Sequence, residues 1–240
     1  MKQNLSIALL VVTAAFAIAP AVTSPFSGFT ATQLPVPQID PPIQPAGYAF
    51  AIWGLIYGWL VVSAIFGVWK RRLDDGWHHA RLPLLVSLAI GVPWLAIAGA
   101  SAIWATITIA LMAIFAIAAL IRAPQADRWW FQAPVGIYAG WLTAATFVSI
   151  GSTMAGYAVL TDAQGWAYIG ITAALIVALL VMRAKPSAPE YGLTVVWALV
   201  GIIVFNGMAN LPVTGLAAVG VIIVGAASFL NSARATSLNA

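Results

Sequence analysis

Long apolar runs, each near the length of a membrane-spanning helix, alternate with short polar connections along this 240-residue chain. A spanning helix needs about 20 mostly apolar residues, because unpaired backbone groups cannot be left in hydrocarbon. We expect eight spans, at residues 5–24, 47–69, 82–99, 102–121, 131–154, 164–182, 191–207 and 211–231. The pattern predicts an all-α fold, a polytopic transmembrane helix bundle.

Two of these spans carry an internal interruption. Pro93 lies well inside the third span, where it removes a backbone donor and should kink the helix. The seventh span runs into the sequence FNGMANLP, so we expect it either to end early or to continue as a broken helix. Its Asn206 and Asn210 are candidates for interhelical hydrogen bonds or for a local polar function.

Composition and charge agree with a membrane protein and add an orientation. Hydrophobic residues make up 62% of the chain and charged residues 7%. Cytoplasmic connections collect lysine and arginine, and the ten cations all fall at the termini or in alternate connections: Lys2, Lys70, Arg71, Arg72, Arg81, Arg122, Arg128, Arg183, Lys185 and Arg234. We therefore expect an integral, multi-pass protein with both termini cytoplasmic, in the inner membrane if the source is bacterial.

The same distribution argues against nucleic-acid binding. The net charge is +4, but the cations are dispersed among short membrane-flanking connections and form no single basic face. The expected surroundings are a lipid bilayer. The first span also has a cation, an apolar run and small residues, features shared with a secretory signal, and its removal would leave seven helices.

Few residues offer chemistry. The chain has no cysteine, so disulfides and thiolate metal sites are excluded. The acidic residues lie outside the expected spans, and His78 and His79 fall in a segment, LDDGWHHARLP, that we interpret as a hydrated interfacial loop. No catalytic triad, phosphate-binding loop or facing carboxylate pair is recognisable, so we expect neither an enzyme nor a metal site.

Aromatic and small residues share neighbouring faces on two of the expected helices. On the second, Ala49, Trp53 and Tyr57 form one stripe, and Gly54 and Gly58 form a GxxxG pair beside it. The fifth repeats the arrangement with an aromatic stripe and a small-residue series, which are Tyr138, Trp141 and Ala145, and Gly136, Gly140 and Ala144. We expect the small residues to let the helices meet and the rings to wall a slot.

Such a slot suits a flat apolar ligand, because aromatic rings stack and their N–H and O–H groups provide polar contacts without charge. Trp94, beside the Pro93 kink, is a candidate for a third wall. Pattern alone equally allows plain structural packing. Other tryptophans at span ends fit an interfacial belt, and they are Trp69, Trp77, Trp129, Trp130 and Trp166.

The segment QPAGYAFAIWGLIY resembles the loop-to-helix motif of the TspO/MBR family, the translocator or tryptophan-rich sensory proteins, which reads approximately PPxxxFxxxWxxLY. Pro45, Trp53 and Tyr57 match, whereas Ala49 replaces the phenylalanine and Phe50 lies one step away. GVPW resembles the family's LNxxW. YAGWLTAATFVS resembles YxxWVxFAxxLN, with Ser149 where Asn is usual.

This resemblance covers residues 1–155 and implies a five-helix core there, followed by three additional helices in 156–240. The family binds tetrapyrroles such as haem or protoporphyrin, as well as sterols. The resemblance therefore implies a porphyrin or haem as a noncovalent ligand, with Ala49, Trp53, Tyr57, Trp94, Tyr138, Trp141 and Ala145 at the site. It also implies that residues 25–46 form a lid.

Three functional hypotheses follow. The first is a non-enzymatic binding protein for a planar hydrophobic ligand, acting as sensor, carrier or regulator. The second is a transporter for a small solute, with a path near Asn206, since transporters bind substrates at helix breaks. The third is an accessory subunit of a larger membrane complex, and a homodimer is a further expected assembly.

Overall fold

The computed structural model describes residues 2–24, 26, 28–30 and 32–237, and helices are the only regular elements among them. The long elements are α1 (Lys2–Val22), α2 (Ile52–Lys70), α3 (Asp75–Gly91), α5 (Ala102–Arg122), α6 (Ala133–Gly156), α7 (Ala163–Ala184), α8 (Pro189–Asn206) and α9 (Leu211–Ser237). The shorter ones are the 3-10 turn η1 (Gly47–Ala51), α4 (Trp94–Ala100) and the π-helical turn η2 (Arg128–Gln132).

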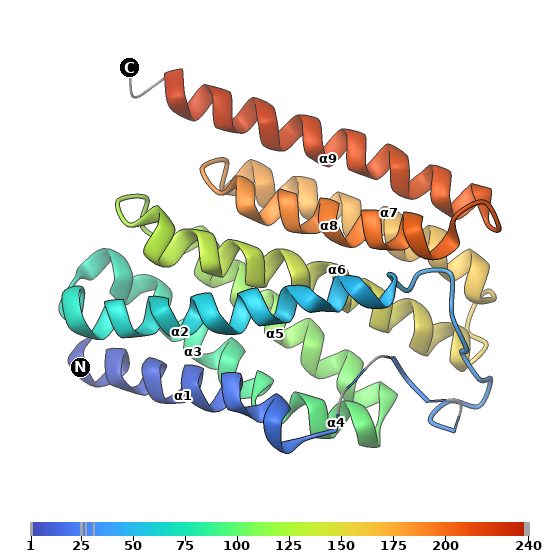
Figure 1. The fold of residues 1–240 in the computed structure, drawn as a ribbon, viewed down its shortest axis with the longest axis horizontal. Helices are drawn as coiled ribbons and strands as arrows, with labels where there is room; N and C mark the ends of the chain where they lie inside the picture. The colour runs from blue at the N-terminus through green and yellow to red at the C-terminus, as the bar shows by residue number, and fades with distance from the viewer. Residues whose placement is uncertain (1, 25, 27, 31, 238–240) are drawn as a thin grey trace.

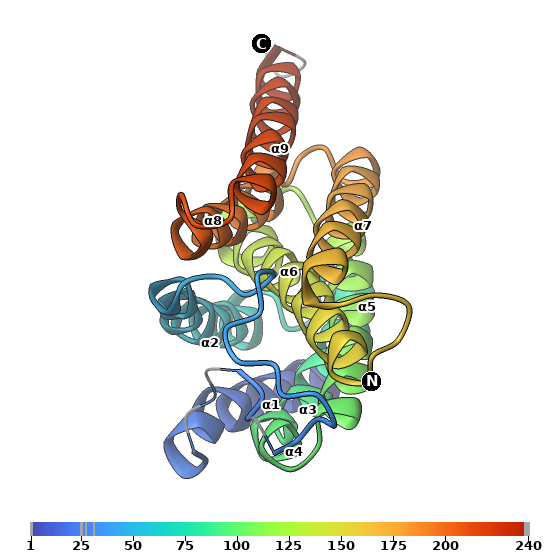
Figure 2. The same ribbon diagram turned by 90° about the vertical axis from the view of Figure 1, so that its right-hand side faces the viewer.

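Eight helical segments in the described part of the chain are long and apolar enough to cross a membrane, which confirms the expected fold class. They run roughly side by side along the long axis in Figure 1. Figure 2 shows α6 in the middle, with α7 and α8 on one side of it and α1, α3 and α4 on the other. Helix α6 is accordingly the most buried span, at 72% of its apolar window.

Both expected interruptions are present. The third span is divided into α3 and α4, and Pro93 is the residue that precedes α4. The seventh span ends at Asn206, because Gly207 adopts a left-handed φ of 50° and a short turn leads to α9. Asn206 donates from Nδ2 to the carbonyl oxygens of Pro42 and Ile202, and Asn210 exchanges amide hydrogen bonds with Gln164.

The segment LDDGWHHARLP is helical from Asp75 onward, so its interpretation as a loop was wrong. Helix α3 begins at Asp75, where the side chain of Asp74 accepts a hydrogen bond from the backbone N–H of Trp77 at 2.9 Å. Trp77 is only 1% exposed and Arg81 is fully buried. Trp77 therefore belongs to the core and not to the interfacial belt.

Long-range partners at this end of the bundle satisfy the buried polar groups. Arg81 donates to the carbonyl oxygens of Arg71 and Arg72, the residues that follow α2. The guanidinium of Arg71 donates to both carboxylate oxygens of Asp127, at 2.7 and 3.0 Å. The indole N–H of Trp77 donates to the same carboxylate at 2.8 Å. These contacts hold the pKa of Asp127 below its usual range.

The connection between α1 and η1 is pinned at several points. The backbone N–H of Val36 donates to the carbonyl oxygen of Gly156 in α6, and that of Ala46 donates to the carbonyl oxygen of Gly201 in α8. Gln33 donates from its side chain to the carbonyl of Ala98, at 2.7 Å. Between these anchors Ile39 and Asp40 form an exposed tip. We call residues 23–46 the first loop.

An aromatic cavity beneath the first loop

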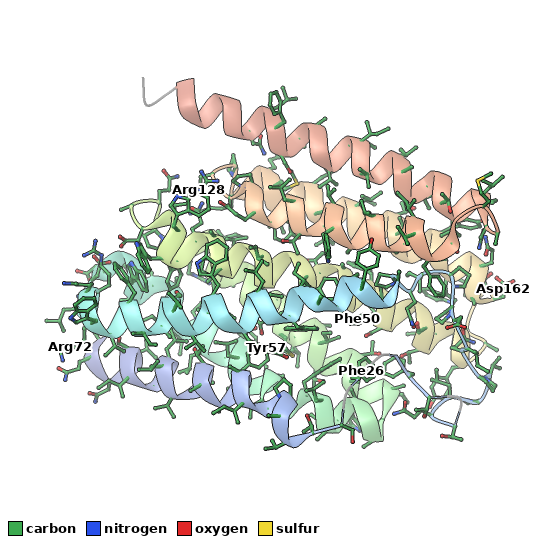
Figure 3. The ribbon with its side chains drawn as sticks, in the orientation of Figure 1. Phe26, Phe50, Tyr57, Arg72, Arg128 and Asp162 are labelled. Atoms are coloured by element: carbon green, nitrogen blue, oxygen red, sulfur yellow. The ribbon has the colours of Figure 1, made fainter. Side chains whose placement is uncertain are left out.

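A cavity of about 280 Å³ lies beneath the first loop and inside the bundle. Its lining comes from α1 to α8 with the first loop and η1, so helices far apart in the sequence share it. The volume is slightly below the range for small-molecule sites, about 300–1,000 Å³. In Figure 3 the labelled Phe26, Phe50 and Tyr57 lie in this part of the bundle.

Three aromatic rings form the wall predicted from the sequence. Trp53 and Tyr57 of α2 stack with centroids 5.2 Å apart and planes 17° from parallel, and Trp141 of α6 meets Trp53 edge to face at 6.3 Å. All three line the cavity. Phe16 of α1 packs edge to face on Trp53 and Tyr57 and closes the group from below.

Three more of the predicted residues also line the cavity. Trp94 lines it where α4 begins, and its indole is fixed by a 3.0 Å hydrogen bond to the carbonyl of Ala105. Ala145 lines it as well. Ala144, which we expected at a helix–helix contact, also lines the cavity.

Trp141 has an unusual polar environment. Its side chain lines the cavity and is 2% exposed, and its Nε1 has no hydrogen-bond partner in the described structure. A buried N–H without an acceptor costs about 1–3 kcal/mol. An acceptor on a bound molecule would remove that cost, so this nitrogen is available to orient a ligand.

Two predicted site residues do not line the cavity. Ala49 is fully buried against α8, where a Cβ placed on Gly201 would lie 3.0 Å from the Cβ of Ala49. The neighbouring Phe50 lines the cavity and packs edge to face on Trp141 at 5.7 Å. The sequence offered this signal, because Phe50 lies one residue from the family's phenylalanine position.

Tyr138 is the second predicted residue that lies outside the cavity lining. It is fully buried and its hydroxyl forms a 2.9 Å hydrogen bond with Ser87, whose own hydroxyl donates to the carbonyl of Met112. The tyrosine therefore fastens α6 to α3 and α5. Its ring still touches Phe16 edge to face, at 5.8 Å, so it supports the aromatic wall from behind.

The small residues divide into two groups. Gly54 and Gly58 are exposed on the outer face of α2, and a Cβ on either would meet no other atom within 4 Å. The buried face of α2 carries Ile56, Leu60 and Gly67, about 200° away from Gly54 around the helix. The expected close contact through this GxxxG pair within the chain is therefore wrong.

Gly136 and Gly140 do make a close helix contact, but the partner is α8 and not α2. A Cβ on Gly140 would lie 2.5 Å from the carbonyl oxygen of Tyr191, and one on Gly136 would lie 3.4 Å from the nitrogen of Tyr191. This approach brings α8 to the central helix. One of the three C-terminal spans is thereby packed directly on α6.

The first loop is fastened over the cavity by Ile43, a residue that the sequence did not single out. Its side chain is 2% exposed, lines the cavity and occupies a notch between α6 and α7. The notch exists because Gly151 and Gly170 lack side chains, and a Cβ on either would collide with Cδ1 of Ile43. Leu34 lies in the same way against Gly156.

The described lining contains no charged side chain and no histidine. Its polar side chains are neutral, namely Ser24, Gln44, Tyr57, Ser149, Ser152 and the tryptophans. His78 and His79 lie near the start of α3, close to Asp75, at the opposite end of α2 from the first loop. Nowhere in the described residues do three or more metal-binding side chains gather.

Eight apolar spans, the first seven of which contribute to one aromatic cavity, define an integral, multi-pass membrane protein. The model of a family described as TSPO-like protein matches residues 4–230. The chain belongs to this family. The match includes the last three spans, beyond residues 1–155 on which the motifs were found. No curated protein and no solved structure matched the chain.

Proposed function

We propose that this protein binds a planar hydrophobic ligand in the cavity beneath the first loop, and acts through that ligand as a sensor, carrier or regulator. The observation that carries the proposal is the wall of Trp53, Tyr57 and Trp141. Their rings contact one another and also line the cavity. Offset and edge-to-face ring contacts favour a flat partner. The unpaired Nε1 of Trp141 supplies one directional contact.

A tetrapyrrole remains the ligand that the family resemblance implies. A porphyrin is larger than a cavity of about 280 Å³ accommodates comfortably, so its binding requires the first loop to move. The loop is held by side-chain insertion at Ile43 and by a few hydrogen bonds, which is a modest set of contacts to release. No metal or covalent cofactor is proposed.

The test is a titration of the detergent-purified protein with protoporphyrin, followed by tryptophan fluorescence. We expect saturable quenching that is lost in the double variant Trp53→Ala, Trp141→Ala, because both cavity rings are removed. The matched control is Trp104→Ala, which removes an indole that is 62% exposed on α5. Quenching that survives unchanged in the double variant, or no saturable quenching at all, would show that the cavity is not the porphyrin site.

The transporter hypothesis placed a path near Asn206. That side chain is 7% exposed, is engaged with Pro42 and Ile202, and does not line the cavity. The position of the cavity under the first loop instead favours a binding protein. We do not propose a role as enzyme or as accessory subunit. A non-enzymatic function stays our prediction.

We also propose that both termini face the cytoplasm. Figure 3 places Arg72 and Arg128 at one end of the bundle and Asp162 at the other, as the positive-inside rule requires for this orientation. The chain contains no cysteine, so single cysteines can be introduced at Arg72 and Asp162. A membrane-impermeant maleimide applied to intact cells should label the second position and spare the first.

A further inference from the structure

The cavity has two walls of different chemistry. The wall from α1, α2, α4 and the first loop is aromatic and consists chiefly of Phe16, Phe26, Phe29, Trp53, Tyr57 and Trp94. The wall from α7 and α8 is entirely aliphatic, and its side chains include Ile171, Ala174, Leu175, Val195, Ala198 and Leu199. Figure 2 shows that α7 and α8 lie on the other side of α6 from α1, α3 and α4. The two walls therefore hold different parts of the cavity.

The aliphatic wall owes its space to small residues. Ala174 and Ala198 line the cavity at positions where neighbouring turns carry isoleucine, leucine and valine. Gly170 and Gly151 leave room that Ile43 fills from the first loop, so this part of the cavity also depends on the lid. One wall of the pocket is thus set by helices that lie outside residues 1–155.

Charge is the second constraint on an occupant. The described lining supplies hydroxyl, amide and indole groups but no counter-ion for a carboxylate, a phosphate or an amine. Burial of an unpaired ion in such surroundings is strongly unfavourable. An occupant that lies wholly inside is therefore uncharged, and a porphyrin dicarboxylate must leave its acidic groups outside.

We propose that the preferred ligand is an uncharged molecule with two parts, a planar ring bearing an oxygen acceptor and an aliphatic chain or cluster. The ring lies against Trp53 and Tyr57 and accepts a hydrogen bond from Nε1 of Trp141, and the aliphatic part lies between α7 and α8 beside Ala174 and Ala198. This inference rests on the proposed function and specifies its ligand class.

The aliphatic part is tested with two probes that share one ring, 2-methyl-1,4-naphthoquinone and its phytyl-substituted form, on the full-length protein in detergent. The phytyl form is larger than a cavity of about 280 Å³, so like a porphyrin it requires the first loop to move. Each buried methylene adds favourable transfer free energy, so the phytyl form should bind at least about tenfold more tightly. In Ala174→Phe the added ring fills the aliphatic part, and the phytyl form should lose about tenfold in affinity while the short form changes by less than about twofold.

Comparison of one probe across variants removes the effect of its partition into detergent. The matched control is Ile176→Phe, which adds the same ring on the same helix at a residue that is 56% exposed. If Ala174→Phe does not fold, as judged by gel filtration and thermal unfolding, Ala198→Leu provides a smaller obstruction from α8. Equal affinity of the phytyl form in wild type and in the obstructed variant overturns the inference.

Charge is tested with protoporphyrin and its dimethyl ester, which differ only in two ionisable groups. The ester should bind more tightly by at least about tenfold, and equal or weaker binding of the ester overturns the claim of an uncharged ligand. These outcomes are separable from the proposed function. If protoporphyrin binds through Trp53 and Trp141 but chain length and esterification have no effect, the proposed function stands and this inference fails. If no probe binds, both fail.

Discussion

The indole N–H of Trp77 on α3 and the carboxylate of Asp127 before η2 are joined by a 2.8 Å hydrogen bond across 50 residues of sequence. Arg71 occupies both oxygens of the same carboxylate. One acidic side chain therefore ties together the end of α2, the start of α3 and the turn that leads into α6. Charge-assisted and bidentate hydrogen bonds are the strong ones.

The first prediction concerns Asp127→Asn. Loss of the charge should lower the free energy of unfolding in mild detergent by about 1–3 kcal/mol. The folded pKa of Asp127 lies below its unfolded value of about 4. Its contribution is therefore complete above that pH and is lost as the pH falls through the folded pKa. Thermal unfolding from pH 7 down to pH 3 should show a smaller acid loss in Asp127→Asn than in wild type. Asp40→Asn, at the exposed loop tip, is the control, and equal acid loss in both variants would refute the assignment.

The second prediction concerns the buried Arg81. Its guanidinium donates hydrogen bonds to the carbonyl oxygens of Arg71 and Arg72, which follow α2. A cation at this place also complements the dipole of α2. Arg81→Met keeps most of the volume and removes these donors, so stability should fall by about 2–3 kcal/mol. Arg72→Met removes an exposed cation from the adjacent turn and should cost less than about 0.5 kcal/mol. Comparable losses in the two variants, measured by thermal unfolding, would contradict this role.

The third prediction separates the glycines of α2 from those of α6. Gly140→Ala places a methyl group against the carbonyl of Tyr191 and should destabilise by about 1–3 kcal/mol. Gly54→Ala meets open space and gains helix propensity, so it should stabilise by about 0.5–1 kcal/mol. Denaturant titrations of the two variants should move in opposite directions. A loss of stability in Gly54→Ala would indicate that this face has a partner in detergent.

The fourth prediction concerns the notch that holds Ile43. Gly170→Val places a side chain where Cδ1 of Ile43 lies, so the first loop should detach from α7. We expect hydrogen exchange at the amides of Val36 and Ala46, which donate to Gly156 and Gly201, to speed up by about tenfold or more, with the spans unchanged. Gly215→Val, on the open face of α9, should leave loop exchange as in wild type. Unchanged exchange in Gly170→Val would show that Ile43 does not fasten the loop.

The spans were predictable because hydrocarbon imposes length and apolarity on every one of them. The early start of α3 was not predictable, because the polar groups of Trp77 and Arg81 are satisfied by Asp127 and by carbonyl oxygens at the end of α2. Without those long-range partners a charged and aromatic segment is typical of a loop at the membrane surface. Only the assembled bundle supplies them.

The candidate site was also only partly predictable from the sequence. Trp53, Tyr57 and Trp141 were found from helical spacing, which places ring-bearing residues on one stripe. The direction in which a stripe points was not available for α2, because that helix is apolar all round and its periodicity does not identify the inner face. Gly54 and Gly58 therefore looked like an interface. The aliphatic wall carries no distinctive residue type, and no sequence signal separates Ala174 or Ala198 from ordinary packing.

The exposed tip of the first loop is a suitable site for a single covalent label. Ile39 is 74% exposed and stands between the anchors at Val36 and Pro42, and the natural chain has no thiol to compete with an added one. A single Ile39→Cys variant can therefore carry a fluorophore or spin label at one defined place. Because that place sits on the segment that covers the cavity, its signal would report ligand entry in real time.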